Sequence, residues 1–514
     1  MTGFTSTTDV LIVGAGPTGL TLALWLERLG TRFRIVDTTP AAAPYSRALG
    51  VHARTLEFDR QLGFADDVVN GGIVMHGINL WVNREKAAHL SLGDLGEDRT
   101  PYPFVLDFAQ DRHERLLIDQ LASRGATIER RTRLVNLEER DDGLVATLQP
   151  PNGSTEECLA SYVAGCDGAH STVRSLTGVG FAGGSYERIF YVADVEARGP
   201  AVDGELHVDL GESDLLAVFA MKGENHVRLV GTLEGKPIVD GRQLSFEDVS
   251  RRPIEQLGLD IRRVNWFSTY HVHHRVASAF RKGRAFLLGD AAHIHSPVGA
   301  QGMNTGIGDS VNLSWKLASV LRGSHPDLLD TYGVERMAFA RRLVATTDRA
   351  FTIATKPGRV AAVVRTRVFP RVVSSAFKIP PFRRWLFRTV SQIAIDYRSS
   401  AISVGRAGAI HGGDRLPWVD LDDRSRGVDN FASLQSLDWQ VHVYGEPDRQ
   451  LIEECQRLGL TLNAFAWSPA AQRAGLARNA TYLVRPDGYV AMATESNPAM
   501  QLADYFQTRG IRLH

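Results

Sequence analysis

The chain has 514 residues, with 58 Lys plus Arg balanced by 58 Asp plus Glu. Its length exceeds what one hydrophobic core usually serves, so two or three domains are expected, and its zero net charge argues against a nucleic-acid partner. The 3 cysteines are too scattered for a disulfide framework or a zinc site, and no apolar run is long enough to span a membrane.

The N-terminal segment predicts a βαβ unit. Residues 9–13 form an apolar run of strand length that ends in glycines, and residues 17–29 carry an apolar stripe with helical spacing. Residues 33–37 form a second apolar, β-branched run. Strand, glycine turn, helix and strand in this order indicate a parallel sheet.

Later segments extend this α/β layer. The elements expected to complete it are a helix at about 111–124 with Asp111 as its N-cap, strands at 126–136, 143–149 and 284–290, and a helix at 303–321.

Residues 186–274 have a different pattern. The segments 191–197, 215–221 and 226–233 alternate apolar and polar side chains, which is typical of antiparallel strands with one covered face. We interpret this region as a second, sheet-based domain inserted into the first.

Residues 341–400 are expected to be helical, with interruptions at prolines. Between residues 351 and 398 there are ten Lys or Arg and one acid, Asp396. A basic amphipathic stretch can bind a membrane surface or an anionic ligand. A solvated face that is balanced by acids elsewhere in the fold is the simpler interpretation.

The tail alternates strand-like and helix-like segments, which predicts a small separate α/β domain after a boundary near 408–415. Its expected elements are strand runs at 439–444 and 482–492 and helices at 447–458 and 497–508.

The first glycine turn, Gly14–Gly19, is a G-x-G-x-x-G motif between a strand and a helix. Gly14 permits the tight turn, Gly16 lets the backbone approach a pyrophosphate, and Gly19 lets the helix pack close to the strand. The motif therefore predicts a dinucleotide site.

The residues around this turn complete the prediction. Pro17 and Thr18 open the helix whose free N–H groups would hold the phosphates. Asp37 ends the next strand and would accept hydrogen bonds from the adenosine ribose. This acid disfavours NADP at the site, but the motif alone leaves FAD and NAD open.

A second glycine-rich segment spans residues 289–304. Gly289 ends a buried strand, and Asp290 follows at its carboxyl end, where open α/β folds bind ligands. An aspartate there can bind a hydroxyl of a ribityl chain. Two such segments in one chain fit the two ends of a flavin dinucleotide, so FAD is the expected cofactor.

The end of this segment suits a flat ring. Pro297, Gly299 and Gly302 keep side-chain bulk away from the ring, and a helix is expected to start near Met303 and Asn304. The N–H groups and dipole of that helix would face the anionic pyrimidine edge of a reduced flavin.

With these motifs, the chain resembles the aromatic-hydroxylase family of flavoprotein monooxygenases, which has the para-hydroxybenzoate hydroxylase fold, over most of residues 8–400. Residues 166–174 look like the DG motif of the family, which serves both FAD and the passing nicotinamide, and Gly289-Asp290 matches its GD motif. The further residues that the resemblance places at FAD are Arg47, Gln110, Arg112 and Asp167.

Two features qualify the resemblance. Asp37 stands where the family more often has Glu, which shortens the reach but keeps the charge. The tail from about 410 is similar to the thioredoxin-like C-terminal domain of the phenol-hydroxylase and polyketide-hydroxylase branch, notably at residues 483–490. It has no C-x-x-C, so thiol redox chemistry is not expected. In relatives this domain is structural or helps to form a homodimer.

The expected fold class is α/β and α+β. It combines a Rossmann-like FAD-binding domain (1–185 and 275–400, with C-terminal helices at 330–400), an antiparallel substrate-binding sheet domain (186–274) and a small thioredoxin-like α/β domain (410–514).

The resemblance also implies a reaction. NADH or NADPH reduces FAD, O₂ adds to give a flavin C(4a)-hydroperoxide, and its distal oxygen goes to an electron-rich aromatic ring. The sheet domain offers few charged pocket candidates, so a neutral phenolic or polycyclic small molecule is expected over a simple benzoate. The N-terminus lacks the pattern of a secretion signal, and a cytoplasmic location is expected.

The candidates for catalysis and substrate binding do not belong to a motif. Phenols react faster as phenolates, so a base or a phenolate-stabilising group is useful. The catalytic candidates are His293 and His295 beside the flavin loop and Tyr270 on the inserted sheet; the substrate candidates are Phe219 and Met221, with alternate residues of their strand expected in the core.

Two alternatives stay open at this point. A Baeyer–Villiger or epoxidising monooxygenase of the same fold would share every motif. A non-catalytic flavin-binding redox sensor with an interaction tail is a different class, which the intact loop at 297–304 disfavours.

Overall fold

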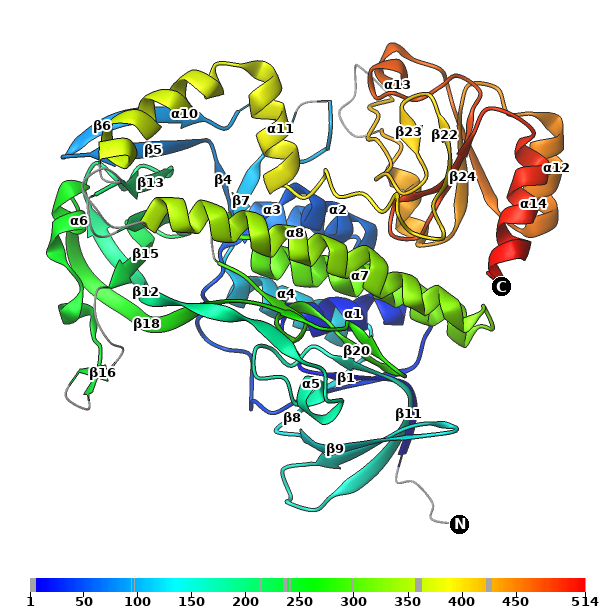
Figure 1. Ribbon diagram of the computed structural model, residues 1–514, viewed down its shortest axis with the longest axis horizontal. Coiled ribbons are helices and arrows are strands. Elements are labelled where there is room, and N and C mark those ends of the chain that lie inside the picture. Colours follow the sequence, from blue (N-terminus) through cyan, green and yellow to red (C-terminus); the bar gives the residue numbers. More distant parts are fainter. Residues whose placement is uncertain are drawn as a thin grey trace.

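The computed structural model describes residues 6–93, 95–96, 98–211, 215–233, 238–239, 242–296, 299–355, 363–421 and 428–513. Three large sheets organise the molecule (Figure 1). Among the described residues, no helix combines the length and apolar character needed to cross a bilayer.

The first sheet is built on the predicted βαβ unit. Strand β1 (Ser6–Val13) leads into helix α1 (Pro17–Arg28) and strand β2 (Phe33–Asp37), and β1 pairs in parallel with β2 and with β11 (Glu156–Gly165). Residues 10–12 of β1 are fully buried, because a strand covered on both faces needs a continuous apolar run. The other strands of this sheet are β8 (Ile128–Arg130), β9 (Arg133–Arg140), β10 (Gly143–Gln149), β19 (Arg281–Lys282) and β20 (Ala285–Leu287).

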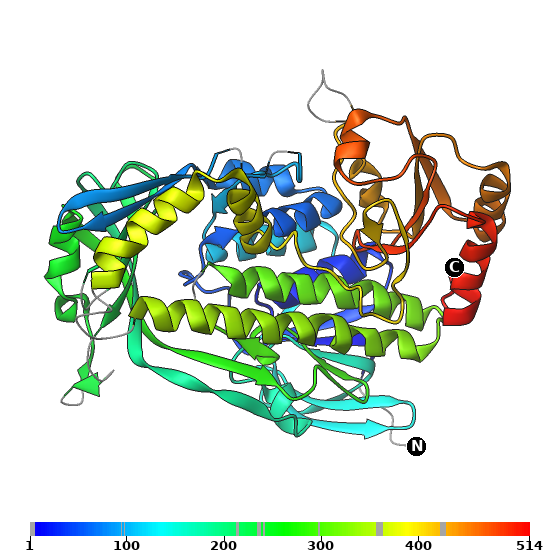
Figure 2. The ribbon, with the colours of Figure 1, turned by 45° about the horizontal axis from the view of Figure 1, so that its top comes forward.

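Helices cover this sheet, and α7 and α8 lie lengthwise through the middle of the molecule (Figures 1 and 2). They are α2 (Ala53–Leu62), α3 (Ala65–Gly71), α4 (Gln110–Ser123), α5 (Thr172–Leu176), α7 (Gln301–Leu321) and α8 (Asp330–Thr355). A small sheet of β3 (Gly50–Val51), β4 (Ile73–Met75) and β7 (Val105–Asp107) lies beside them.

Two predicted helix starts were wrong. Helix α4 begins at Gln110 with Ala109 as its N-cap, so Asp111 lies in the first turn. The Ser46 hydroxyl oxygen accepts the Asp111 N–H at 3.0 Å, and the hydroxyl donates to the Asp111 carboxylate at 2.9 Å. Ser46 therefore satisfies an N–H of the first turn, as an N-cap side chain would. Helix α7 begins two residues before the expected Met303, at Gln301.

The second sheet is antiparallel for most of its width, as the alternating sequence predicts. It extends beyond residues 186–274, because it also contains strands from residues 77–91 and 293–294. Its strands are, in order across the sheet, β21 (His293–Ile294), β18 (Asp260–Ala277), β12 (Phe181–Arg198), β15 (His226–Leu233), β14 (Leu216–Ala220), β13 (Leu206–Asp209), β5 (Gly77–Val82) and β6 (Glu85–Ser91).

The two faces of this sheet differ. One face carries an apolar cluster that includes Tyr191, Val218 and Leu229, and packs against Ile254 and Leu257 from the segment of helix α6 (Arg251–Gln256). The opposite face carries the alternate residues and looks toward the first sheet. A separate short hairpin of β16 (Ile238–Val239) and β17 (Arg242–Gln243) completes the region.

The predicted C-terminal helices are present, and their prolines lie at helix starts. Pro370 opens α10 (Phe369–Phe377), after a π-helical turn at Val364–Val368, and Pro380 opens α11 (Pro380–Val390). Helix α10 lies along the outer edge of the second sheet at β6, and α11 lies between that sheet and the C-terminal domain (Figures 1 and 2).

The tail forms a third, mixed sheet with the strand order β23-β22-β27-β26-β24-β25, and the predicted strand at 482–492 is a hairpin of two strands. This is the thioredoxin-like arrangement expected from the sequence. Its elements are β22 (Val404–Ala407), β23 (Ile410–His411), β24 (Gln440–Tyr444), α12 (Arg449–Leu458), β25 (Thr461–Phe465), α13 (Pro469–Arg473), β26 (Thr481–Val484), β27 (Val490–Thr494) and α14 (Pro498–Arg509).

Candidate flavin site

The Gly14–Gly19 turn has the geometry that a dinucleotide needs. Gly14 has φ +104°, and a Cβ there would overlap the Cys166 carbonyl group. A Cβ on Gly19 would overlap the Gly14 carbonyl oxygen. A Cβ on Gly16 would meet no atom within 4 Å, so the space before the N-terminus of α1 is open where a pyrophosphate would bind.

The neighbouring motif residues have local roles as well. Pro17 is the first residue of α1. The Thr18 hydroxyl lies 2.6 Å from the position of a Cβ on Gly289, and a Cβ on Gly306 would overlap the same hydroxyl. The Thr18 side chain thus packs between the second glycine segment and α7. The predicted contact of Thr18 with the cofactor stays a prediction.

Asp37 stands at the end of β2, as predicted. One carboxylate oxygen accepts the Ala15 N–H at 2.7 Å, and the other accepts the Thr39 N–H at 2.7 Å. The carboxylate therefore orders the glycine turn. Its predicted role at the ribose stays a prediction.

Asp167 joins the two halves of the DG motif. One of its carboxylate oxygens accepts the backbone N–H groups of Thr172 at 2.7 Å and Val173 at 3.1 Å, at the start of α5. The other oxygen is buried without a hydrogen-bond partner among the described residues. An acceptor left over in this way is available to a cofactor hydroxyl, because buried polar groups are nearly always paired.

Arg174 ties the DG motif to the GD segment. Its guanidinium donates to the Ala291 carbonyl at 2.8 Å and to the Ala169 carbonyl at 2.7 Å, and it lies 3.9 Å over the Phe181 ring. The two family motifs are therefore one connected unit.

The Gly289 turn is held from α7. Gly289 has φ +57°, and its N–H donates to the Asp309 carboxylate at 3.0 Å. The next side chain, Asp290, is exposed, yet burial raises the pKa of its carboxyl group. The exposed carboxyl group at the end of this turn suits the predicted contact with a ribityl chain.

His293 belongs to a buried polar network. Its Nε2 lies 2.7 Å from the Asp309 carboxylate, which also accepts the Arg336 guanidinium at 2.6 Å. Arg336 in turn donates to the Tyr397 hydroxyl at 2.9 Å. His293 is only 1% exposed and is held by this network, and its Nδ1 has no hydrogen-bond partner among the described residues. Its predicted catalytic role stays a prediction.

His295 is better placed. Its Nδ1 lies 2.9 Å from the Ser296 carbonyl oxygen, so Nδ1 carries the proton and Nε2 is an acceptor. That Nε2 is buried without a partner among the described residues, and the imidazole faces Gly302, with a ring carbon 3.9 Å from the position of a Cβ there. Burial lowers the pKa of His295 to about 4, which keeps the ring neutral.

The flavin loop is fixed by a side chain. Gly299 and Ala300 both have positive φ, 78° and 53°, and α7 starts directly after them. The Asn304 amide nitrogen donates to the Gly50 and Ala300 carbonyls, and its oxygen accepts the His52 N–H at 2.9 Å.

Asn304 therefore positions the loop, while Met303 is buried beside it. Pro297 lies outside the described residues.

The remaining predicted cofactor residues lie at the edges of this region. Arg47 is exposed and stacks over the Tyr270 ring at 4.9 Å. Gln110 donates to Glu114 at 2.7 Å within α4, and Arg112 is exposed on the same helix. Their contacts with FAD stay predictions.

The second sheet presents polar groups to this region. Arg228 of β15 makes a bidentate ion pair with Asp194 of β12, at 2.6 and 2.8 Å, and reaches the Ala48 carbonyl at 3.3 Å. Phe219 pairs with Arg228 across the strands and so shares this face, and Tyr270 pairs with Phe190 next to it.

The strand of Phe219 alternates as expected. Leu216 and Val218 are in the core on the other face, while Met221 follows the strand and is half-buried.

Asp107 was missed by the sequence reasoning. It pairs with Gly50 across β7 and β3, so its side chain shares the face on which a Cβ of Gly50 would lie 2.7 Å from the Ala300 Cβ. That face is toward the flavin loop. One Asp107 oxygen is buried without a partner among the described residues, and burial raises the pKa of this carboxyl group to about 8, against the attraction of Arg228.

Charged residues inside apolar strands were the signal that could have found this group. Arg228, Asp194 and Asp107 all interrupt strand-like runs in the sequence.

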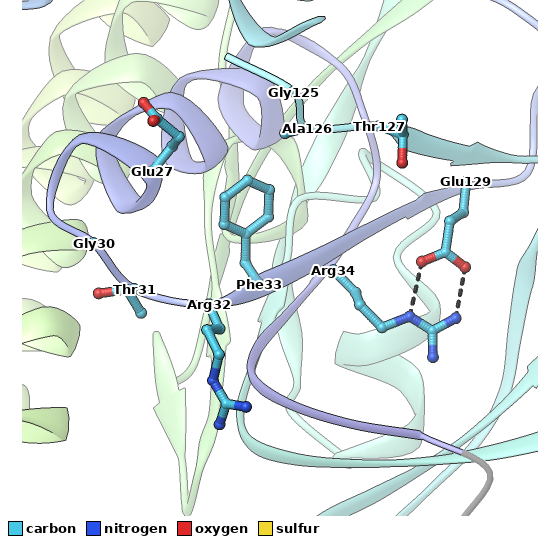
Figure 3. Close-up of a pocket in the computed structure, with 10 residues that line it drawn as sticks. All are labelled: Glu27, Gly30, Thr31, Arg32, Phe33, Arg34, Gly125, Ala126, Thr127 and Glu129. Atoms are coloured by element: carbon cyan, nitrogen blue, oxygen red, sulfur yellow. Dashed lines mark hydrogen bonds and ion pairs between the residues drawn. The ribbon is translucent and has the colours of Figure 1, made fainter.

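A separate hollow of about 500 Å³ lies at the far end of β2 from the cofactor turn (Figure 3). Its charged groups already have partners, because Arg34 makes a bidentate ion pair with Glu129 and Arg32 bonds Asp9. We assign no ligand to it.

Comparison with known proteins agrees with this geometry. A family model described as "FAD binding domain" matches residues 7–347. A flavin-dependent monooxygenase of Mycobacteroides abscessus is 33% identical over 504 residues, which cover 95% of this chain and 97% of that protein. Pentachlorophenol 4-monooxygenase of Sphingobium chlorophenolicum is 32% identical over 428 residues, 82% of this chain and 77% of its own.

A solved structure is similar over the whole chain. The anhydrotetracycline hydroxylase OxyS from Streptomyces rimosus has a TM-score of 0.78 and 27% sequence identity, and the match covers 98% of this chain and 99% of that chain.

Proposed function

The chain belongs to the FAD-binding monooxygenase family, and from this premise we propose that it uses NAD(P)H and O₂ to hydroxylate a neutral phenolic or polycyclic aromatic compound. One observation carries the proposal: the predicted FAD cradle, defined by the open space at Gly16 and the exposed Asp290, lies near the face of the second sheet that carries Arg228 and Tyr270. The contacts of Arg47 with Tyr270, and of Arg228 with Ala48, join these two regions directly.

The residues present fit FAD. The N-terminus of α1 and the backbone at Gly16 would hold the pyrophosphate, and Asp37 would bind the adenosine ribose. Asp290 and the free oxygen of Asp167 are acceptors for the hydroxyls in the middle of the cofactor. The N-terminus of α7 would face the pyrimidine edge.

Bound FAD supplies hydride acceptance and oxygen activation; the protein supplies orientation, charge and exclusion of water. Burial raises the pKa of Tyr270 to about 12, so its hydroxyl stays protonated at neutral pH and can donate to a phenolate oxygen. The neutral His295 presents Nε2 as an acceptor for a phenol proton. Arg228, fixed by Asp194, adds a positive charge to the same face.

The substrate class is supported by the composition of that face and by the relatives. One relative is named for pentachlorophenol and a solved one for anhydrotetracycline. Arg228 is already held in an ion pair by Asp194, so it is not free to form a bidentate pair with a substrate carboxylate.

The test is oxidation of NADH and of NADPH by the FAD-loaded protein, with a panel of phenols, polycyclic phenols and benzoates. We expect a phenolic member to stimulate NAD(P)H oxidation and to gain one oxygen atom from ¹⁸O₂ on the ring. A ring-expanded lactone or an epoxide would identify the alternative chemistry of the same fold. If no aromatic compound stimulates oxidation, the hydroxylase proposal fails.

A further inference from the structure

The outer surface of residues 363–390 combines exposed apolar side chains with positive charge. This stretch contains seven Lys or Arg and no Asp or Glu, in a chain whose charges sum to zero over its full length. Helices α10 and α11 carry it on the periphery of the molecule (Figures 1 and 2). The large apolar side chains exposed on this α10–α11 surface are Val363, Val364, Val368, Phe369, Val372, Ile379 and Trp385.

The inner sides of the two helices are already used by the fold. Val373 and Phe377 of α10 pack against Leu80 and Leu90 of the second sheet. Phe387 of α11 is 3% exposed. The helices are therefore held in place by one side, and the exposed residues are not a face that the core needs.

The exposed side is unusually apolar for a solvated helix pair. Val372 is 58% exposed, Ile379 54% and Trp385 59%. Several large, exposed apolar side chains within one short stretch of chain mark an interaction site on a folded protein. The Trp385 ring also packs on the Phe382 ring, with 5.9 Å between the ring centroids, so the indole is held at the surface by the helix beneath it.

Four cations around these side chains have no ion-pair partner among the described residues. Arg367, Arg371, Lys378 and Arg384 are exposed and make no salt bridge with a carboxylate in the described part of the chain. A solvated face balanced by neighbouring acids, the simpler interpretation of the sequence, would show such pairs.

We propose that the α10–α11 surface docks on an anionic lipid bilayer, with Val372, Ile379 and Trp385 inserted at the headgroup level and the surrounding Lys and Arg contacting lipid phosphates. The combination is what an interfacial helix requires: apolar side chains to bury, an indole suited to the boundary, and cations that stay in the polar layer. An acidic protein would pair with the cations but would leave the aliphatic side chains and the indole without a matching environment. The contact is peripheral, because no described helix can cross a bilayer.

The experiment is co-sedimentation of the full-length FAD-loaded protein with phosphatidylcholine vesicles, with and without phosphatidylglycerol. We expect binding only to the anionic vesicles, at least tenfold weaker in 0.5 M NaCl, because salt screens surface charges. Lipids brominated near the headgroup should quench Trp fluorescence in the wild type and much less in Trp385→Phe.

Two variants and two matched controls separate the surface from general effects. Arg371→Glu with Arg384→Glu should remove binding, and so should Ile379→Ser with Trp385→Ser. The controls Arg449→Glu with Arg457→Glu on α12, and Met500→Ser on α14, change equally exposed residues elsewhere and should bind as the wild type does. Flavin content confirms that each variant is folded.

Three results would overturn the proposal: no sedimentation with anionic vesicles at low salt, equal binding to both vesicle types, or unchanged binding by both test variants. Because none of these readouts needs turnover, the result is independent of the hydroxylase proposal.

Discussion

At the scale of single residues, the two glycine segments pack directly against each other. Thr18 of the first segment fills the space that Gly289 and Gly306 leave, and the Ser310 hydroxyl donates to the Thr18 carbonyl at 2.7 Å. A larger residue at either glycine would separate α1 from α7. The glycines of the fingerprint thus divide into those needed for packing and one, Gly16, that faces open space.

Gly16→Ala tests this division. The added methyl group has room in the fold, so the free energy of unfolding of the FAD-free protein should change by less than about 1 kcal/mol. The methyl group stands where the pyrophosphate would approach the backbone, so FAD affinity should fall at least tenfold. The control Gly333→Ala also adds a methyl group to open space, within α8, and should retain FAD. Equal FAD affinity in the two variants would contradict the assignment of the cradle.

Asp107→Asn is expected to stabilise the protein in a pH-dependent way. The folded-state pKa of Asp107 is about 8 against an ordinary value of 3.8, because burial penalises its charge. The folded protein therefore holds a proton that the unfolded chain has lost, and the wild type loses stability as pH rises from about 4 to about 8. The neutral amide has no such titration.

The measurement is thermal unfolding at pH 5 and pH 8. The gain in Tm of Asp107→Asn over the wild type should be larger by several degrees at pH 8. Asp504→Asn, which alters an exposed aspartate on α14, should show no such difference. A gain that is equal at both pH values would mean that Asp107 is ionised in the folded protein throughout.

At the scale of elements, local pattern was sufficient wherever a strand or helix has one consistent environment. The limits of β2 and β15 agree with the sequence prediction, and the βαβ unit was found with its turn. Strand β18 was expected only around Tyr270, and its 18-residue extent was not predicted, because its apolar residues are spread among histidines and arginines along a half-exposed strand. Strands β5 and β6 were also missed: they lie far from 186–274 in sequence, and only tertiary pairing with β13 brings them into the sheet.

For the candidate flavin site, too, only features with a local sequence pattern could be predicted. Backbone roles follow from motif spacing, so the glycines and Asp290 were found at the proposed cradle. Side chains whose roles depend on a distant partner were not. Arg228 needs Asp194, and His293 needs Asp309, which lies on α7 beyond the end of the motif. Sequence spacing contains no information on such pairs.

At the scale of the whole molecule, a buried charge cluster joins the C-terminal domain to the flavin domain. Arg485 makes a bidentate ion pair with Glu335 of α8, at 2.8 and 3.0 Å, and also bonds Asp487. Lys316 of α7 donates to the same Glu335 at 2.8 Å. All four side chains are 1% exposed or less. The opposite charges hold the pKa of Glu335 well below its usual range.

Arg485→Met should therefore be far more damaging than loss of a surface arginine. It leaves Glu335 and Asp487 short of positive charge in the interior, a change that costs about 3–5 kcal/mol. Urea unfolding should show that loss, whereas Arg457→Met on α12, where the arginine is 62% exposed, should cost less than about 1 kcal/mol. The double variant Arg485→Met with Glu335→Gln should recover part of the stability. If the double variant recovers no stability, the packing of these side chains, and not their charges, stabilises this contact.

The cluster also sets an order of events during synthesis. Glu335 leaves the ribosome 150 residues ahead of Arg485, together with Lys316 and the rest of α7 and α8. Until the RPDG turn at 485–488 emerges, Glu335 has Lys316 but lacks Arg485 as a counter-charge, so burying it is less favourable on the nascent chain. Because α7 also supplies the helix start at the cofactor site, we expect stable flavin loading to follow emergence of residues 485–488.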